Sequence, residues 1–327
     1  MSKHDDVGLV LEPTEDHPAI RAWRQLAMGN RRPQSIEVLK APKRKSAVYR
    51  LVGTGPSGLG LIAKSAEPER LRREAELYER VLSHLPLQML EVYGLIESDG
   101  EWWLFLEDAG EVWYSPDAEM HRRPAVEWLG RLHTSPLPSE HRLPDAGPAH
   151  FSEVLTRAYE GIAGARSHQA ASASDVTVLD NILRLLEHTT RSWAAVTRAC
   201  EGVPGGLVHG DFVPKNVRVT TRGDRTGLVV FDWETAGLGP PAADLALLPG
   251  GEDEVLLYYA LVTKAWPEIT LAVVRRLCVV GQLFRLLHCI EWELRSFTYP
   301  WIERAMRRLE IYRDELDRTR HLGRGIW

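Results

Sequence analysis

The chain reads Leu207-Val208-His209-Gly210-Asp211-Phe212-Val213-Pro214-Lys215-Asn216 and, shortly after, Val229-Val230-Phe231-Asp232-Trp233-Glu234. Two aspartates and an asparagine lie here in loops that interrupt apolar, strand-like runs, with Asn216 five residues after Asp211 and Asp232 sixteen residues after Asn216. An ionised Asp211 can orient an acceptor hydroxyl and take its proton. Asn216 and Asp232 offer the hard oxygen ligands that Mg²⁺ prefers. The spacing predicts transfer of a phosphoryl group from ATP, with Asp211 as the catalytic residue.

His209 precedes the predicted catalytic residue by two positions. We expect its side chain to brace the loop rather than to act as an acid or a base. The structural alternative for Asp211, a turn-capping aspartate, leaves the spacing to Asn216 and Asp232 unexplained.

The bulk properties are those of an ordinary globular enzyme. A length of 327 residues favours about two domains or one large two-lobed domain. With a net charge of −5, neither a nucleic acid nor an anionic membrane surface is an expected partner. The most apolar segment, 269–290, is interrupted by three arginines and a glutamine, which predicts a buried core helix rather than a membrane span.

The cysteines and the N-terminus indicate the compartment. Cys200, Cys278 and Cys289 form no CxxC pair and are interpreted as reduced, buried thiols. The segment Met1–Asp6 lacks the apolar core of a signal peptide. We therefore expect a cytoplasmic protein, and the sequence leaves open whether it is a monomer or a homodimer.

Residues 1–109 are predicted to form a small, nucleotide-binding lobe. A leading helix is expected near 18–28, because Ile20, Trp23 and Leu26 lie on one helical face. Alternating apolar residues then predict a mostly antiparallel sheet with one helix, 67–85. The expected strands are 35–40, 47–53, 59–64, 90–97 and 102–107.

Residues 110–327 change to a helical pattern, which the two aspartate loops interrupt at 207–235. We expect this lobe to hold the catalytic loop, the metal site and the acceptor site. The predicted fold class is α+β, a small antiparallel β lobe with one helix followed by a larger helical lobe. The expected helices are 117–133, 149–165, 175–199, 253–264, 270–294 and 299–319.

The small lobe carries candidate nucleotide-binding residues. Lys64 ends an apolar strand and can reach the α/β-phosphates as a point charge. Glu74 lies beside the apolar stripe of the next helix whereas Glu76 points away, so Glu74 is the expected partner that holds the lysine. In the link between the lobes, adenine recognition would use backbone groups, the Glu107 carbonyl and the Ala109 N–H.

Two turns are candidates to cover the phosphates. Gly53-Thr54-Gly55-Pro56-Ser57-Gly58 matches GxGxxG literally, but a strand-like run rather than a helix follows it. We interpret it as a hairpin turn rather than a nucleotide loop. The preceding turn, 40–46, carries four cations and the hydroxyl of Ser46, and is the better candidate. A solvated basic loop is the open alternative.

The motifs resemble the aminoglycoside phosphotransferase family, also called the phosphotransferase enzyme family. His209-Gly210-Asp211 with Asn216 resembles its catalytic loop, and Asp232-Trp233-Glu234 resembles its metal-binding segment. Asp244-Leu245-Ala246 resembles the family's Asp-Leu-Ala, although Pro240 stands where an Asp is usual. The resemblance implies a protein-kinase-like fold, ATP or sometimes GTP, Mg²⁺, and phosphorylation of a free hydroxyl on a small molecule.

Two features argue against a protein kinase. Val213 stands where Ser/Thr kinases carry a lysine. Only eleven residues separate Asp232 from Asp244, which leaves no room for a segment that docks a peptide. The cleft is therefore better suited to a small molecule.

The leading hypothesis is a kinase that phosphorylates an antibiotic, aminoglycoside-like or another sugar or nucleoside antibiotic, and so confers resistance. The alternatives are a metabolite kinase with a choline-, sugar- or homoserine-like acceptor, and an ATP-binding pseudokinase that regulates. Two glutamates of the helical lobe could bind an amino-sugar cation, or could form a solvated charged helix end. Candidate acceptor-binding residues are Asp117, Glu291, Glu293, Tyr299 and Trp301.

Overall fold

The computed structural model describes residues 8–26, 31–43, 46–55, 60–139, 142–222, 225–248 and 251–326, and omits the side chains of 41–43, 222 and 225. The segment 1–7, half of the GxGxxG turn, residues 44–45 of the basic turn and the terminal Trp327 therefore lie outside what can be described. The remaining chain combines an antiparallel sheet with a set of helices, so the predicted α+β class is confirmed.

Contacts group the chain into two compact units. Unit 1 combines Met1–Tyr114 and Leu137–His141 with Pro214–Glu234, and unit 2 contains the rest. The sequence placed 214–234 in the helical lobe that starts at residue 110. The structure groups it with the sheet because a strand of this segment hydrogen-bonds to residues 112–114, with Val219 N donating to Val112 O (2.8 Å) and Tyr114 N donating to Val217 O (3.4 Å).

The sheet of unit 1 has six strands in the order β1-β2-β3-β4-β6-β5, and every neighbouring pair is antiparallel. The turn between β5 and β6 contains Asp99 and Gly100, both with positive φ (53° and 78°), as a tight hairpin with right-handed strand twist requires. The strands are β1 (Val10–Leu11), β2 (Ser35–Lys43), β3 (Ser46–Val52), β4 (Leu61–Ala66), β5 (Val92–Ser98) and β6 (Glu101–Glu107).

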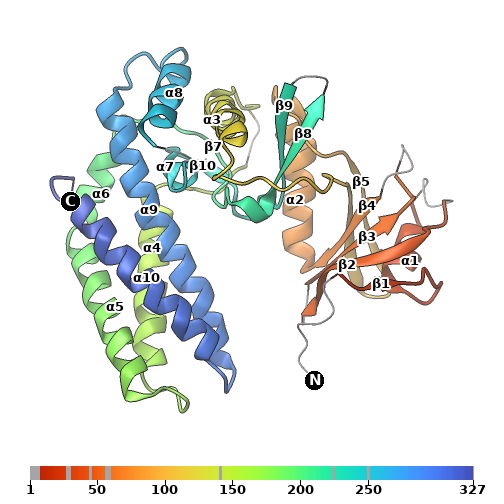
Figure 1. Ribbon diagram of the computed structural model, residues 1–327, viewed down its shortest axis with the longest axis horizontal. Helices are drawn as coiled ribbons and strands as arrows, with labels where there is room; N and C mark the ends of the chain where they lie inside the picture. The colour runs from red at the N-terminus through yellow and green to blue at the C-terminus, as the bar shows by residue number, and fades with distance from the viewer. Residues whose placement is uncertain are drawn as a thin grey trace. The chain divides into compact units, whose positions relative to one another are not determined.

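Strand alternation gives this sheet two different faces. On β3, Ala47, Tyr49 and Leu51 are buried and alternate with half-buried residues. They belong to the core that also contains Trp23 of α1 (Pro18–Trp23), the short helix beside the sheet in Figure 1. α1 ends five residues before the predicted end. The opposite face carries the polar residues of the site described below.

Two further elements complete unit 1. Helix α2 (Pro68–Arg80) buries its apolar stripe with Glu74 and is followed by the 3-10 turn η1 (Leu82–His84). Strands β8 (Val217–Arg222) and β9 (Arg225–Val230) form an antiparallel hairpin. The 3-10 turns η2 (Pro214–Asn216) and η3 (Trp233–Thr235) lie just outside its two strands.

Unit 2 is helical, with α4, α5, α9 and α10 packed side by side (Figure 1). Helix α9 buries apolar residues along much of its length, so the core helix expected at 269–290 is confirmed. None of the described helices combines the length and the apolar character that crossing a bilayer requires. The helices are α3 (Glu119–Thr134), α4 (Pro148–Ala165), α5 (Ala173–Arg191), α6 (Trp193–Cys200), α7 (Ala242–Leu245), α8 (Glu252–Val262), α9 (Leu271–Leu294) and α10 (Glu303–Leu322), with the 3-10 turn η4 (Arg295–Thr298).

Three details differ from the sequence expectation. The single helix expected at 175–199 is two helices, because the chain turns at Ser192 (φ −92°, ψ 0°). The last helix begins at Glu303 rather than at 299, after the extended residue Tyr299. The strand-like run before His209 is β7 (Gly206–Val208), but its pairing with β10 (Gly237–Gly239) and the four-residue α7 were not foreseen.

Candidate active site

Lys64 lies on the polar face of the sheet, between two carboxylates of unit 1. Its Nζ donates to Glu74 Oε2 on α2 (2.7 Å) and to Asp232 Oδ1 (2.6 Å). The side chains of Lys64 and Glu74 are 14% and 2% exposed. Glu76, the other glutamate considered, is exposed. The structure therefore pairs Lys64 with the glutamate that lies next to the apolar stripe of α2.

Burial and charge act on this lysine in opposite directions. Burial on its own lowers the pKa of Lys64, because the cation loses its hydration. The nearby carboxylates of Glu74 and Asp232 more than offset this effect and raise the pKa above its ordinary value. Lys64 is thus held as a cation, as a phosphate-binding lysine must be.

Asn216 and Asp232 lie at the same end of the β8–β9 hairpin, just outside its first and last paired residues. The register pairs Val217 with Val230, and Phe231 N donates to Asn216 O (3.1 Å). Strand pairing therefore places the two predicted metal ligands at the same end of the hairpin. Asp232 has φ +68°, a left-handed conformation that costs energy for a residue with a side chain. This conformation accompanies the contact of its carboxylate with Lys64.

The donor set at this point fits Mg²⁺. Mg²⁺ takes one or two protein ligands and completes its shell with phosphate oxygens and water. Asp232 is 33% exposed and uses Oδ1 on Lys64, while Asn216, whose amide oxygen is the second predicted ligand, is buried. Within the described ranges, no group of three or more His, Cys, Asp or Glu side chains could hold a metal ion. An ion at this site would depend on the phosphates of a nucleotide.

A pocket in unit 1 surrounds these groups. Ser46, Glu107 and Ala109, all predicted nucleotide contacts, line it together with Lys64, Glu74 and Asp232. Its apolar lining residues come from several strands and are combined with polar and charged groups, as is usual for a small-molecule site. Lys40 of the predicted phosphate-covering turn and Glu234 of the predicted metal-binding segment line it too, whereas sequence reasoning did not single out the polar lining residues Arg50, Arg70, Asp108 and Arg218.

The predicted catalytic loop follows β7 in unit 2. His209 is fully buried, its Nδ1 accepts from Asp211 N (3.2 Å), and its carbonyl accepts from Thr235 Oγ1 (2.9 Å). Gly210 has φ +78°, and a Cβ there would lie 2.7 Å from Thr235 O. These contacts support the bracing role expected of His209.

Asp244 on α7 accepts hydrogen bonds from the backbone of the same loop and was not among the predicted site residues. Its Oδ2 and Oδ1 accept from the N–H groups of His209 and Gly210 (both 2.8 Å), and Oδ2 lies 3.1 Å from His133 Nε2. Burial raises the pKa of Asp244, but the hydrogen bond and charge of His133 hold it below its usual value. The Asp-Leu-Ala motif was the signal that could have found it.

The predicted acceptor residues of unit 2 have partners within the protein. Glu291 accepts from Arg157 (2.5 Å) and Glu293 accepts from Arg308 (2.6 Å). Tyr299 stacks on the exposed Trp301, with ring centroids 5.5 Å apart. Asp117 is exposed before α3. Their role in acceptor binding stays a prediction.

A different part of α9 lies near the catalytic loop. Burial raises the pKa of Cys289, and the negative charges of Asp211 and Glu315 raise it further. Cys289 is therefore close enough to Asp211 to be influenced by its charge. Tyr312 and Glu315 of α10 flank the same cysteine. Cys289 on α9 is thus within electrostatic range of Asp211.

A mixed sheet-and-helix fold with a buried lysine–glutamate pair and a braced Gly-Asp loop defines the class of protein-kinase-like phosphotransferases. The chain belongs to the phosphotransferase enzyme family, whose sequence model matches residues 40–286. It is therefore a small-molecule kinase of that family. A search of curated protein sequences found no significant match.

Solved structures of kinases with different acceptors share the fold. A spectinomycin phosphotransferase in complex with ADP and spectinomycin has 11% identity and a TM-score of 0.61, covering 92% of this chain and 97% of that one. Choline kinase from Cryptosporidium parvum Iowa II has 10% identity and a TM-score of 0.59, covering 89% and 90%. A microcompartment-associated aminopropanol kinase has 13% identity and a TM-score of 0.59, covering 91% and 94%. At such identities the likeness shows the fold alone.

Proposed function

We propose that this enzyme transfers the γ-phosphoryl group of ATP to a hydroxyl of a small molecule, with Mg²⁺ as the metal. The observation that carries the proposal is Lys64, a buried cation held between Glu74 and Asp232 (2.7 and 2.6 Å) inside a pocket. GTP is the alternative nucleotide. A buried lysine with two carboxylate partners and an open pocket in front of it is built to meet phosphate.

The proposed roles follow from the chemistry of each group. Lys64 binds the α/β-phosphates, and Glu74 keeps its ammonium group in place. Asp232 and Asn216 hold Mg²⁺, which neutralises charge on the phosphate oxygens when bound. Asp211 accepts a hydrogen bond from the acceptor hydroxyl and takes its proton. His209 and Asp244 support the backbone on which Asp211 is presented.

The nucleotide base is proposed to bind at the linker end of the pocket. Glu107 and Ala109 line that end, together with the apolar side chains of Ile62 and Leu106. The Glu107 carbonyl and the Ala109 N–H would read the base edge, while the aliphatic side chains cover its faces. Ser46 lies at the other end, where the phosphates would be, and its hydroxyl is 3.1 Å from Lys40 Nζ.

For the acceptor we propose a hydroxylated antibiotic without a high positive charge, such as a neutral sugar or nucleoside antibiotic. A polycationic aminoglycoside needs several free carboxylates, and two of the three candidate carboxylates, Glu291 and Glu293, are each ion-paired with an arginine. A cationic acceptor would have to displace those arginines, which costs the charge-assisted bonds they make. A choline-, sugar- or homoserine-like metabolite is the alternative acceptor.

Transfer of labelled γ-phosphate from Mg·ATP to an acceptor panel tests the proposal. The panel holds aminoglycosides, macrolides, nucleoside antibiotics, choline, homoserine and simple sugars, and Mg·GTP serves as a second donor. Wild type should label one class, and Asp211→Asn should lower turnover between about 100-fold and about 10,000-fold with nucleotide affinity nearly unchanged. Wild-type turnover in that variant would exclude the role of Asp211. Nucleotide binding without transfer to a widened panel would favour the pseudokinase.

A further inference from the structure

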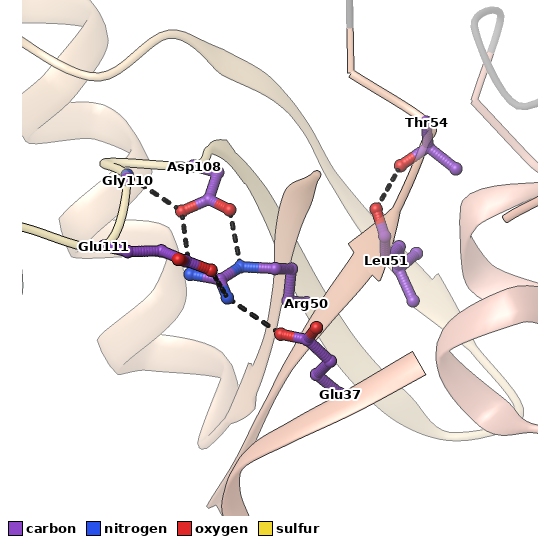
Figure 2. A network of polar contacts seen from close by, with 7 residues as sticks. All are labelled: Glu37, Arg50, Leu51, Thr54, Asp108, Gly110 and Glu111. Carbon is purple, nitrogen blue, oxygen red and sulfur yellow. Dashed lines mark hydrogen bonds and ion pairs between the residues drawn. The ribbon is translucent and has the colours of Figure 1, made fainter. Parts of the chain in front are cut away.

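Arg50 occupies the linker end of the nucleotide pocket and binds the linker directly (Figure 2). Its Nε donates to Asp108 Oδ2 (2.6 Å), and a second guanidinium nitrogen lies 3.4 Å from Asp108 Oδ1. Its remaining nitrogen donates to Glu37 (2.8 Å) and Glu111 (3.1 Å). One guanidinium thus joins two strands and the linker.

The register of the sheet explains how Arg50 reaches this position. Arg50 on β3 lies directly opposite Glu37 on β2 and Ile62 on β4, and Ile62 lies opposite Leu106 on β6. Partners in such a row share one face of a sheet. Because Ile62 and Leu106 are pocket walls, Arg50 extends along that wall to the residue that follows β6 by one position, Asp108.

Gly60 leaves the space that the pair needs. A Cβ at Gly60 would lie 2.7 Å from Arg50 Cγ and 3.1 Å from Asp108 Oδ2. The first distance is shorter than a van der Waals contact, and Cγ is too close to the backbone to swing away easily. A side chain at residue 60 would therefore push Arg50 and Asp108 out of their observed geometry.

The contact with Asp108 is well shielded from water, whereas the contact with Glu111 is not. The side chains of Arg50 and Asp108 are 14% and 12% exposed, against 31% for Glu37 and 82% for Glu111. Burial alone would lower the pKa of Arg50, but Asp108 and Glu37 raise it above its usual value. A shielded, two-pronged pair is stronger and more directional than an exposed one.

Asp108 in turn shapes the linker. Its Oδ1 accepts from Gly110 N (3.0 Å), and Gly110 has φ +86°, so the carboxylate closes a tight turn. On the preceding side, Glu107 N donates to Glu91 O (2.8 Å) and Glu107 Oε2 accepts from Glu91 N (3.1 Å). The backbone from 107 to 110 is therefore anchored at both ends, with Arg50 at the second anchor.

We propose that Arg50 is a positioning residue for the nucleotide base: by clamping Asp108 it holds the linker backbone in the one conformation that presents the Glu107 carbonyl and the Ala109 N–H to the base. This inference rests on the proposed function, since it presumes a nucleotide in this pocket. A linker that is already ordered spends no binding free energy on ordering, so the clamp increases affinity for the base and not for the phosphates.

Two probes separate this role from a general effect on the fold. Mg·ATP uses the base and the phosphate parts of the pocket, whereas Mg·tripolyphosphate uses the phosphate part alone. Affinity is measured by titrating a fluorescent ATP analogue and displacing it with ATP, GTP or tripolyphosphate, on the full-length protein. Failure of wild type to bind any nucleotide would overturn the proposed function and, with it, the role of Arg50 that presumes a bound nucleotide.

Arg50→Ala should lower the affinity for ATP about tenfold, because it removes a shielded charge-assisted pair. The affinity for tripolyphosphate should not change, because that pair lies at the base end of the pocket and not at the phosphate end. Arg50→Lys should recover part of the loss, since an ammonium cannot make the two-pronged contact. Gly60→Ala should behave like Arg50→Ala without any change of charge. Glu111→Gln removes an exposed partner and is the matched control, with ATP affinity as in wild type.

Equal weakening of ATP and tripolyphosphate in Arg50→Ala would overturn the inference, because it would indicate a disturbed fold. Unchanged ATP affinity in both Arg50→Ala and Gly60→Ala would also overturn it. Lys64→Ala is the reciprocal control, since loss of a phosphate ligand should weaken both probes. The ATP-to-GTP affinity ratio is the second readout: a loosened linker should bring this ratio closer to one, which loss of stability alone would not do.

Discussion

Lys64 shows how one residue depends on two carboxylates from distant parts of the chain. Glu74 lies ten positions away and Asp232 lies 168 positions away, yet both contact the same ammonium group. Glu74 is almost fully buried, so it can compensate charge without competition from water. Asp232 is partly exposed and would be shared with a metal. The two carboxylates are therefore not equivalent.

Glu74→Gln is expected to weaken Mg·ATP binding about tenfold, or by about 1.4 kcal/mol, and to lower turnover. The amide keeps the size of the side chain but removes the charge that holds Lys64 in place. Isothermal titration calorimetry measures the affinity directly. Glu76→Gln, an exposed position on the same helix, is the control and should bind as wild type does. Equal affinities for both variants would contradict the role of Glu74.

His288 makes the stability of the protein depend on pH. Burial, with the positive charges of His150 and Arg157, lowers its pKa from 6.5 to about 4, although Glu291 acts in the opposite direction. The unfolded chain then binds the proton more readily than the folded chain does between these two values. The free energy of unfolding should therefore fall as the pH falls from 6.5 towards 4, by about 2 kcal/mol for this residue.

Urea unfolding at about pH 7 and about pH 4.5 measures the effect. His288→Gln should show a smaller loss of stability between the two pH values than wild type. His84→Gln, which changes an exposed histidine, should lose as much as wild type. A loss in His288→Gln as large as in wild type would assign the pH dependence to other groups.

At the scale of elements, helix α9 and the short helix α7 approach unusually closely. A Cβ at Gly281 on α9 would lie 1.9 Å from Ala242 O on α7. Helix α7 carries Asp244, which accepts hydrogen bonds from the predicted catalytic loop. The position of that loop therefore depends on the close packing at a glycine of α9.

Gly281→Ala should destabilise the protein by about 1–3 kcal/mol, because the methyl group has no room and must separate the two helices. Turnover should fall with little change in nucleotide affinity, since the pocket residues lie in unit 1. Gly164→Ala on α4 is the control: no atom lies within 4 Å of its added Cβ, and it should stabilise by roughly 0.5–1 kcal/mol. Thermal unfolding and single-turnover kinetics measure both. Equal stability in the two variants would contradict the packing argument.

The elements that the sequence predicted are those with a repeating local signal. Apolar alternation located five of the six strands of the main sheet but not the two-residue β1, and the helical stripe distinguished Glu74 from Glu76. No such signal exists for α7, which has four residues, or for the turn at Ser192 between α5 and α6. The Arg50–Asp108 pair joins residues 58 positions apart. It depends on the register of three strands, which periodicity does not determine.

At the scale of the whole molecule, the pocket is built by one unit from separate pieces of chain. Its described lining residues, from Leu39 to Gly110 and from Arg218 to Glu234, all belong to unit 1. The chain leaves unit 2 at residue 214 and returns to it at 235, and within that segment Asp232 lines the pocket. The described lining of the pocket thus belongs to unit 1, whereas Asp211 belongs to unit 2.

This division predicts where a nucleotide changes hydrogen exchange. Mg·ADP at 100 times its dissociation constant should stabilise the folded state by about 2.7 kcal/mol. Protection should appear in β4, in the linker 107–110 and in the segment 216–234. Adenosine alone should protect the linker and leave the Lys64 and Asp232 segments unchanged, because it lacks the phosphates that those residues bind. Exchange measured by mass spectrometry on the full chain resolves these peptides. Mg·ADP protection that omits both β4 and the linker would place the nucleotide outside this pocket, and the roles proposed for Lys64 and Arg50 would then be wrong.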